Sequence, residues 1–323
     1  MPSTRSKSAK KQPLAPPLVE QLEDTFTRLK KRFPELIGIG LGYRRRRGRV
    51  VPEVTVKLQV RKKIRHPEKE MRLLPKHVKL TTIALGQPVT ISVPTDIEAP
   101  QRMTPTFTTV DGMKVAMLAA WLDEQGSRRF GVISAGHGLE QQTTPVELAD
   151  GTHAVGQVVA KSDLVRDGYD VGLVDVDVAP AQLPQLSSEL PVPASAQQLL
   201  DMISLDPQDN ISVEGETWSS SNRETIQALA FFVSWQWQGL PSALKHVVQC
   251  GGTIGTFERG TSGSVWTTKP PGRLVMAIQS HAHEPKYSQA EGTHFLSAVE
   301  WLMQQPGIYD LRIAWQPSDL PQA

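Results

Sequence analysis

The sequence has almost no cysteine and no long hydrophobic run, and each absence narrows the class of protein. Cys250 is the single cysteine among 323 residues, so no disulfide can form within the chain. No stretch of 18 or more apolar residues occurs, which argues against a membrane-spanning helix. The first eleven residues are polar and basic without an apolar segment behind them, and this argues against a secretory signal. We therefore expect a cytoplasmic protein without a membrane span.

Charge is distributed unevenly along the chain, although the net charge is only +2. Residues 1–80 contain 22 lysines and arginines against 7 acidic residues, whereas the remainder contains 13 against 26. The basic part can bind an anionic partner, such as nucleic acid or a membrane surface, or lie against the acidic part of its own chain. Because no aromatic residues interleave Arg44–Arg47, we interpret this run as a solvated hairpin tip and not as a nucleic-acid patch.

The N-terminal third predicts a small α+β module over residues 17–105. Residues 1–16 lack periodicity and apolar content, so we expect a disordered basic tail there. Apolar residues from Val19 to Leu29 recur at helical spacing, and Pro34 ends the pattern. The alternation of apolar residues then changes to that of strands. The expected elements are a helix over 17–33, a hairpin of strands over 36–43 and 54–60, and a further strand between 80 and 93.

The chain beyond residue 105 is typical of β-structure. Short apolar segments are separated by turn signals such as Asp111-Gly112 and Asp150-Gly151, which favours a barrel or sandwich. A Pro/Ala/Gln-rich segment interrupts this pattern and divides the strands into two sets. The expected units are a first set of strands over about 106–180, a linker over 181–209, a second set over 210–292, a closing helix over 293–305, and an extension over 306–323 with an edge strand at 309–315.

Three motifs in these strands carry residues suited to nucleophilic chemistry. An apolar strand, Val132–Ser134, runs into small residues and then His137. Asp170 opens a second strand of alternating apolar residues. Ser262 lies in the turn Gly260–Ser264, whose glycines leave a hydroxyl and several backbone N–H groups exposed. The three groups follow in the order His, Asp, Ser, 33 and 92 residues apart.

These motifs resemble the histidine, aspartate and serine motifs of chymotrypsin/trypsin-like serine peptidases, and their order in the chain is that family's. The resemblance covers residues 106–305 and implies a mostly β fold with two antiparallel barrels and the site in the cleft between them. It implies that Ser262 is the nucleophile, His137 the general base and Asp170 the group that orients the imidazole. The N–H groups of Gly260 and Ser262 would form the oxyanion hole.

The activity implied by the resemblance is that of an intracellular serine endopeptidase, which hydrolyses protein or peptide substrates through an acyl-enzyme without a cofactor or metal. Thr261 stands where zymogens of the family carry an aspartate, so activation by N-terminal cleavage is not expected. Thr256 stands where trypsin specificity requires an aspartate, so no preference for basic residues is expected. The other implied substrate-binding residues are Ile278, Gln279 and Ser280, the last expected to hydrogen-bond Asp170.

Other chemistry-bearing residues have simpler interpretations. His281 and His283 form an H-x-H pair without further ligands at zinc-site spacing, so we expect solvated loop histidines. Cys250 lies in a short apolar strand and is expected to be a small buried residue. Four further acids close to the aspartate motif fit turns or later strand positions better than the site: Asp163, Asp167, Asp175 and Asp177.

A second hypothesis comes from a different class of protein. The N-terminal module resembles, more weakly, modules that precede trypsin-like domains in some bacterial peptidases and in narrow-leaf-type plant proteins, and that likeness implies no reaction. A catalytically inactive trypsin-like scaffold, binding a peptide or an anionic partner, would carry the same motifs. The position of His137 relative to Ser262 distinguishes the two hypotheses.

Overall fold

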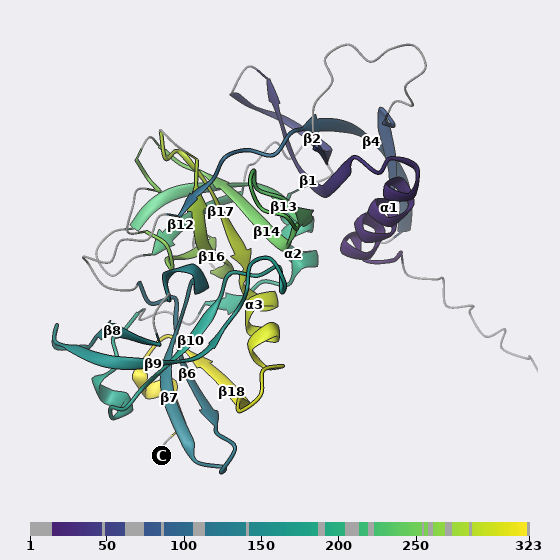
Figure 1. The fold of residues 1–323 in the computed structure, drawn as a ribbon. Coiled ribbons are helices and arrows are strands. Elements are labelled where there is room, and N and C mark those ends of the chain that lie inside the picture. Colours follow the sequence, from purple (N-terminus) through teal and green to yellow (C-terminus); the bar gives the residue numbers. More distant parts are fainter. Residues whose placement is uncertain are drawn as a thin grey trace, which may run out of the picture.

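The computed structural model describes most of the chain. The expected tail up to residue 14, the tip residue Arg47 and the oxyanion-hole residue Gly260 lie outside the described residues. The fold is mostly β, as predicted, with two β-sheet bodies and a small N-terminal α+β module (Figure 1). The described residues are 15–46, 49–61, 74–84, 87–105, 114–139, 142–186, 191–203, 213–218, 223–253, 255–257, 261–268, 273–283 and 286–321.

The predicted helix and hairpin of the N-terminal module are confirmed. Helix α1 (Leu18–Arg32) has Glu20 in its first turn and basic residues in its last, which suits the helix dipole. Strands β1 (Leu36–Arg46) and β2 (Arg49–Val60) form an antiparallel hairpin. The single strand expected between 80 and 93 is wrong. The chain forms the antiparallel pair β3 (His77–Ala84) and β4 (Gln87–Glu98) there.

The first sheet body has six described strands in the order β18-β6-β7-β10-β9-β8. The edge strand β18, near the C-terminus, confirms the strand expected at 309–315, whereas the sequence analysis did not predict β8. Short 3-10 turns at Gly136–Gly138, Pro180–Gln182 and Pro317–Asp319 accompany the strands. The strands are β6 (Met117–Leu122), β7 (Arg128–Ser134), β8 (Thr143–Glu147), β9 (His153–Lys161), β10 (Gly172–Val176) and β18 (Tyr309–Ala314).

The second body is a closed antiparallel barrel. Its strands follow the ring β12-β15-β16-β17-β14-β13, and β13 pairs with β12 to complete it. Two short segments, β5 (Thr104–Pro105) and β11 (Val192–Pro193), also pair with β16. The strands are β12 (Val213–Trp218), β13 (Arg223–Trp235), β14 (Leu244–Gly251), β15 (Val265–Thr268), β16 (Leu274–Ala282) and β17 (Gln289–His294).

Two helices accompany the barrel. The closing helix α3 (Phe295–Leu302) follows β17 directly. It is shorter than the helix expected over 293–305, because residues 293 and 294 still belong to the strand. Part of the expected linker is ordered as α2 (Ala196–Met202), because Ser195 and Gln198 form a capping box at its start. No helix in the described part of the chain combines the length and the apolar character that crossing a membrane requires.

The two bodies share a hydrophobic core, which positions the site at their junction. One cluster of buried residues combines Trp121 and Leu173 of the first body with Val265 and Ile278 of the barrel and Phe295 of α3. Burial of this apolar surface favours a fixed arrangement of the two bodies. The relative position of their strand ends is therefore set by packing.

The N-terminal module is joined to the barrel through a continuous sheet. Strand β1 pairs with β2 on one edge and with β13 on the other. The strands approach closely at Gly40, where a Cβ atom would lie 2.5 Å from the carbonyl oxygen of Phe231. Glycine is needed there because any side chain would collide with the neighbouring backbone.

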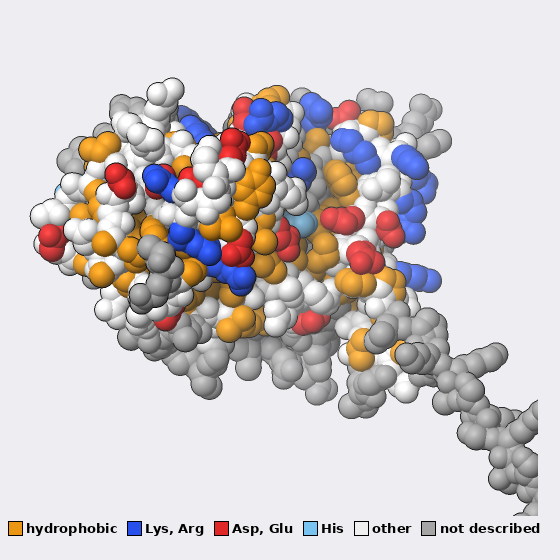
Figure 2. All heavy atoms as spheres, turned by 90° about the horizontal axis from the view of Figure 1, so that it is seen from below, with side chains coloured by type: hydrophobic (Ala, Val, Ile, Leu, Met, Phe, Trp, Pro, Cys, Tyr) orange, Lys and Arg blue, Asp and Glu red, His pale blue; other side chains and the backbone are white. Residues whose placement is uncertain are grey.

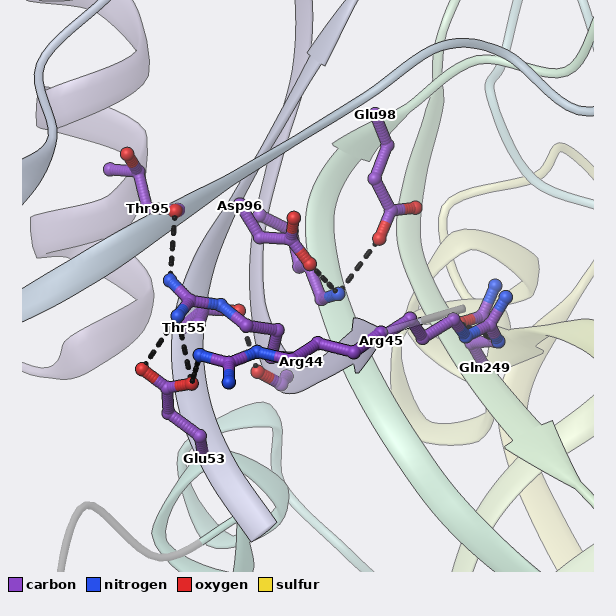
Figure 3. A network of polar contacts seen from close by, with 11 residues as sticks. Arg44, Arg45, Glu53, Thr55, Thr95, Asp96, Glu98 and Gln249 are labelled. Atoms are coloured by element: carbon purple, nitrogen blue, oxygen red, sulfur yellow. Dashed lines mark hydrogen bonds and ion pairs between the residues drawn. The ribbon is translucent and has the colours of Figure 1, made fainter. Parts of the chain in front are cut away.

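Several basic residues of the module are paired within the chain (Figure 3). Arg44 donates to both carboxylate oxygens of Glu53, at 2.7 and 2.8 Å. Arg45 reaches the barrel and donates to Oε1 of Gln249 at 3.0 Å. The interpretation of these two arginines as a solvated tip is therefore wrong, because carboxylate and amide oxygens of the folded chain replace water around them.

On the face drawn in Figure 2, Lys and Arg side chains gather toward the right-hand side beside a few Asp and Glu side chains, and hydrophobic side chains lie between charged ones over the rest of the face. A buried cation also has partners inside the module. Lys57 donates to Asp96 at 2.8 Å and to Glu98 at 2.7 Å. Arg44, Arg46 and Lys57 thus meet acidic groups of the same module.

Replacement of Gly40 by alanine tests the close approach of β1 and β13. We expect Gly40→Ala to lower the free energy of unfolding by about 1–3 kcal/mol, because the added methyl group displaces backbone. Chemical denaturation measures the change. Gly251→Ala is the control, since its Cβ meets a flexible side-chain end, Cδ1 of Leu229, at 3.0 Å. Equal losses in both variants would contradict the argument.

Candidate active site

His137 and Asp170 meet because of the register between two strands. Strands β7 and β10 are antiparallel, and Gly172 pairs with Ser134. His137 follows Ser134 by three residues and Asp170 precedes Gly172 by two, so both leave the sheet at the same end. Gly136 makes this approach feasible, because a Cβ there would lie 2.8 Å from the carbonyl oxygen of Val171.

The carboxylate of Asp170 is bound to His137 through both of its oxygens. His137 donates its backbone N–H to Oδ1 at 2.8 Å, and its ring nitrogen Nδ1 lies 2.6 Å from Oδ2. The backbone N–H of Asp170 donates to Oγ1 of Thr293, on barrel strand β17, at 3.0 Å. Burial raises the pKa of Asp170, but the charge and the hydrogen bond of His137 outweigh it and hold this pKa well below its usual range. The pair therefore contains a charged, desolvated carboxylate.

Ser262 lies in a turn that packs against the strand leading to His137. Gly263 has a φ of +89°, and a Cβ there would lie 2.5 Å from Oγ of Ser134 and 2.6 Å from the carbonyl oxygen of Lys114. Both the left-handed backbone and the lack of space require glycine. The Ser262 side chain is buried, and its Oγ donates to the carbonyl oxygen of Ser280 at 2.7 Å.

The serine turn is bound to β16 on its other side. Gly263 donates its N–H to the carbonyl oxygen of Gln279 at 2.9 Å, and Gln279 donates its N–H to Ser264 at 2.8 Å. The side-chain amide of Gln279 donates to Oγ1 of Thr261. Ile278, one residue earlier, pairs with Val265 on one edge of β16 and with Thr293 on the other. Ile278 and Gln279 thus lie on a barrel strand that is already paired with neighbouring segments of the same chain.

The remaining predicted substrate-binding residues differ in their surroundings. The side chain of Ser280 faces Asp170 closely enough to lower the pKa of that carboxyl, although among the described residues its Oγ makes no hydrogen bond of ordinary geometry. Thr256 is buried, and its Oγ1 lies 3.0 Å from Oγ1 of Thr253. Beyond Ser280, the edge of β16 is covered by β5, whose Pro105 pairs with His281.

His281 belongs to the site, although sequence analysis placed it in a solvated loop. Strand β16 continues through Ala282 and turns His281 inward, where only 5% of the residue is exposed. Its ring centroid lies 4.7 Å from that of His137 and 3.8 Å from that of Trp237. Burial lowers the pKa of His281 to about 3; the charge of His137 acts in the same direction and Asp170 opposes it. The imidazole is therefore neutral at physiological pH.

The competing nucleophile and acids lie elsewhere. Cys250 is buried on β14, and burial raises the pKa of its thiol well above the ordinary value, so a thiolate is disfavoured. Asp175 lies on β10 and pairs with Arg129, whose Nε is 3.0 Å away. Asp163 accepts backbone N–H groups of its own turn. The expectation that Cys250 is a small buried residue is confirmed.

Comparisons with known proteins gave matches only among solved structures. No protein-family model and no curated protein matches the chain. It is similar to Protease A of Thermobifida fusca, with 11% identity, a TM-score of 0.39, and 62% of this chain and 90% of that chain covered. It is also similar to a chymotrypsin of Cellulomonas bogoriensis, with 13% identity, a TM-score of 0.36, and 63% and 98% covered. At such low identity, activity has to be argued from the site itself.

The neutral state of His281 predicts a pH dependence of stability. Between pH 6.5 and about 3 the unfolded chain binds a proton at His281 that the folded chain does not, so the free energy of unfolding falls as the pH is lowered. His281→Phe should remove this contribution, which reaches about 1.4 kcal/mol per pH unit. Chemical denaturation between pH 4 and 7 measures it, with His153→Phe on exposed β9 as the control for loss of a histidine. Identical slopes in the wild type and His281→Phe would contradict the assignment.

Proposed function

We propose that the protein is a cytoplasmic serine endopeptidase of the chymotrypsin type, with His137, Asp170 and Ser262 as its catalytic triad. The observation that carries the proposal is the double hydrogen bond from His137 to the buried carboxylate of Asp170. This pairing holds the imidazole in one orientation and leaves Nε2 as the ring atom for proton transfer. The cytoplasmic setting is proposed from the single cysteine.

The positions of Ser262 and His137 support their cooperation. The hydroxyl of Ser262 is bonded to the carbonyl oxygen of Ser280, and the ring of His137 packs on the next residue, His281. Both groups therefore contact consecutive residues of β16. A rotation of Ser262 about χ1 changes the direction of its hydroxyl without moving the backbone, and a low barrier between staggered rotamers permits it. We propose that substrate binding selects the rotamer directed at Nε2 of His137.

The reaction then follows from the charges at the site. Ser262 Oγ attacks the carbonyl carbon of the scissile peptide bond while His137 Nε2 takes the hydroxyl proton. The backbone N–H groups of Ser262 and Gly260 are the proposed donors to the oxyanion. His137 returns the proton to the leaving amine, and a water molecule hydrolyses the acyl-enzyme by the same steps. The charged, buried Asp170 stabilises the imidazolium that forms in each half-reaction.

Substrate class and control are also part of the proposal. Thr256 occupies the position expected for a specificity residue and carries no charge, so we propose substrates without a required basic side chain. Thr261 is held by the side-chain amide of Gln279, which stabilises the serine turn without a newly formed N-terminus. We therefore propose that no N-terminal cleavage precedes activity, and that the N-terminal module serves regulation or partner binding.

One observation favours the second candidate, a catalytically inactive scaffold. Ser262 Oγ donates to a backbone carbonyl, and β5 covers the edge of β16 beyond Ser280. Such an arrangement would persist in a protein that only presents a binding surface. Reactivity of Ser262 decides between the two candidates.

Labelling by a fluorophosphonate probe tests Ser262 directly. We expect covalent labelling of the wild type and none of Ser262→Ala, with peptidase kcat lower by on the order of 10⁶-fold in the variant. Ser264→Ala is a matched control, since this neighbouring serine is also buried and its Oγ has no hydrogen bond among the described residues. Mass spectrometry locates the adduct. Absence of labelling in wild-type protein with a cooperative unfolding transition would favour the inactive scaffold.

Asp170→Asn tests the orienting role of the carboxylate. An amide cannot accept hydrogen bonds through both of its terminal groups, so the imidazole loses its preferred tautomer and kcat should fall by about 10⁴-fold. Steady-state kinetics on a peptide substrate measure the effect. Asp175→Asn, on β10 five residues further along and paired with Arg129, should leave kcat near the wild-type value. A comparable loss in both variants would indicate a general structural effect.

A further inference from the structure

Three side chains at the junction of the two bodies form a cluster of metal-ligand type. His137, Asp170 and His281 each offer a nitrogen or oxygen atom, and these atoms all lie within 4.8 Å of one another. They are brought together from the segment before β10, from β16 and from the turn after β7, far apart in the sequence. Two imidazoles and a carboxylate are a common donor set for Zn²⁺ and for other divalent transition metals.

His281 has the features of a ligand and few of a core residue. Its Nδ1 is buried and makes no hydrogen bond to any described part of the chain. Its ring packs against Trp237, whose indole N–H donates to the buried carboxylate of Glu291. The ring is thus enclosed by protein while one nitrogen remains unsatisfied, which is costly in a folded protein. A bound cation would satisfy that atom.

A second pair of histidines shows what a structural role looks like in this chain. His246 and His294 have ring centroids 6.3 Å apart. Nδ1 of His294 lies 2.8 Å from Oγ of Ser297, and its Nε2 lies 2.8 Å from the carbonyl oxygen of Ala194. His246 Nδ1 lies 2.7 Å from the same Ser297 oxygen. These nitrogens are engaged by protein atoms, in contrast to Nδ1 of His281.

The spacing of the three side chains also suits a cation. Ligand atoms bound at about 2.1 Å in a tetrahedral zinc site lie roughly 3.4 Å apart. Since no separation in the cluster exceeds 4.8 Å, the ligand atoms have to approach one another by at most about 1.4 Å. Rotation of an imidazole about its Cβ–Cγ bond moves its nitrogens by such a distance.

We propose that His137, Asp170 and His281 bind a divalent transition-metal ion, with Zn²⁺ as the best match to this donor set, and that the bound ion blocks the active site. Ligation withdraws His137 and Asp170 from proton transfer, so occupancy and catalysis exclude each other. The blocking of catalysis rests on the proposed peptidase function. The binding of the ion does not.

Calorimetric titration of the metal-free full-length protein with ZnCl₂ tests the binding. We expect one ion per chain, a loss of affinity of about 100-fold in His281→Phe, and wild-type affinity in His153→Phe, where an exposed histidine is removed. Absence of binding to the wild type would overturn the proposal. Equal affinity in the wild type and His281→Phe would do the same.

Co²⁺ provides a test that needs no variant of a buried residue. Co²⁺ added to the metal-free wild type should give the intense visible absorption of a four-coordinate ion, and Zn²⁺ should displace it. A spectrum unchanged from that of hydrated, octahedral Co²⁺ would contradict a site built from these three ligands.

Fluorophosphonate labelling with and without Zn²⁺ tests the blocking of the active site. We expect Zn²⁺ to slow labelling of Ser262 at concentrations that fill the calorimetric site, and a chelator to restore it. Labelling that Zn²⁺ does not slow would overturn the blocking role. If the metal-free protein is not labelled at all while Zn²⁺ binds as predicted, the peptidase function fails and the metal site stands.

Discussion

The arrangement of the site depends on the buried carboxylate of Asp170. Removing this group from water is costly, and the backbone N–H and the imidazole of His137 offset the cost. That compensation requires the register of β7 against β10, since a shift by one residue would turn one side chain to the other face. Oγ1 of Thr293, in the barrel, accepts a hydrogen bond from the backbone N–H of Asp170. The hydrogen bonds around Asp170 are therefore complete only when both bodies are assembled.

Local pattern accounts for what could be predicted from the sequence. The helix at the start of the module and the hairpin after it follow from apolar spacing and a terminating proline, and the candidate triad follows from motifs at strand ends. The inward position of His281 could not be predicted in this way. It depends on β16 continuing between β17 and β5, and therefore on pairing with Glu291 and Pro105. Residues far away in the sequence bury His281, so the sequence around His281 does not indicate its burial.

The partner of the basic residue Arg45 also depends on residues far away in the sequence. Composition left two kinds of partner open for residues 1–80, an anionic partner such as nucleic acid or a membrane surface and the acidic part of the same chain, because the local pattern of an arginine is the same beside either. Arg45 contacts Gln249, 204 residues away in the sequence, since β1 lies beside β13 and β13 beside β14. The partner was set by sheet order, which strand patterns alone do not specify.

That sheet order also connects the module to the site. Glu291 has a buried side chain that accepts hydrogen bonds from Gln249 and from the indole of Trp237, and Trp237 packs against His281. Arg45 donates to the same Gln249; burial lowers the pKa of Arg45, and the charges of Glu98, Glu291 and Asp96 oppose this effect. The module is therefore connected to Glu291 by the hydrogen bonds of Gln249, and Trp237 links Glu291 to His281, the ring that packs against His137.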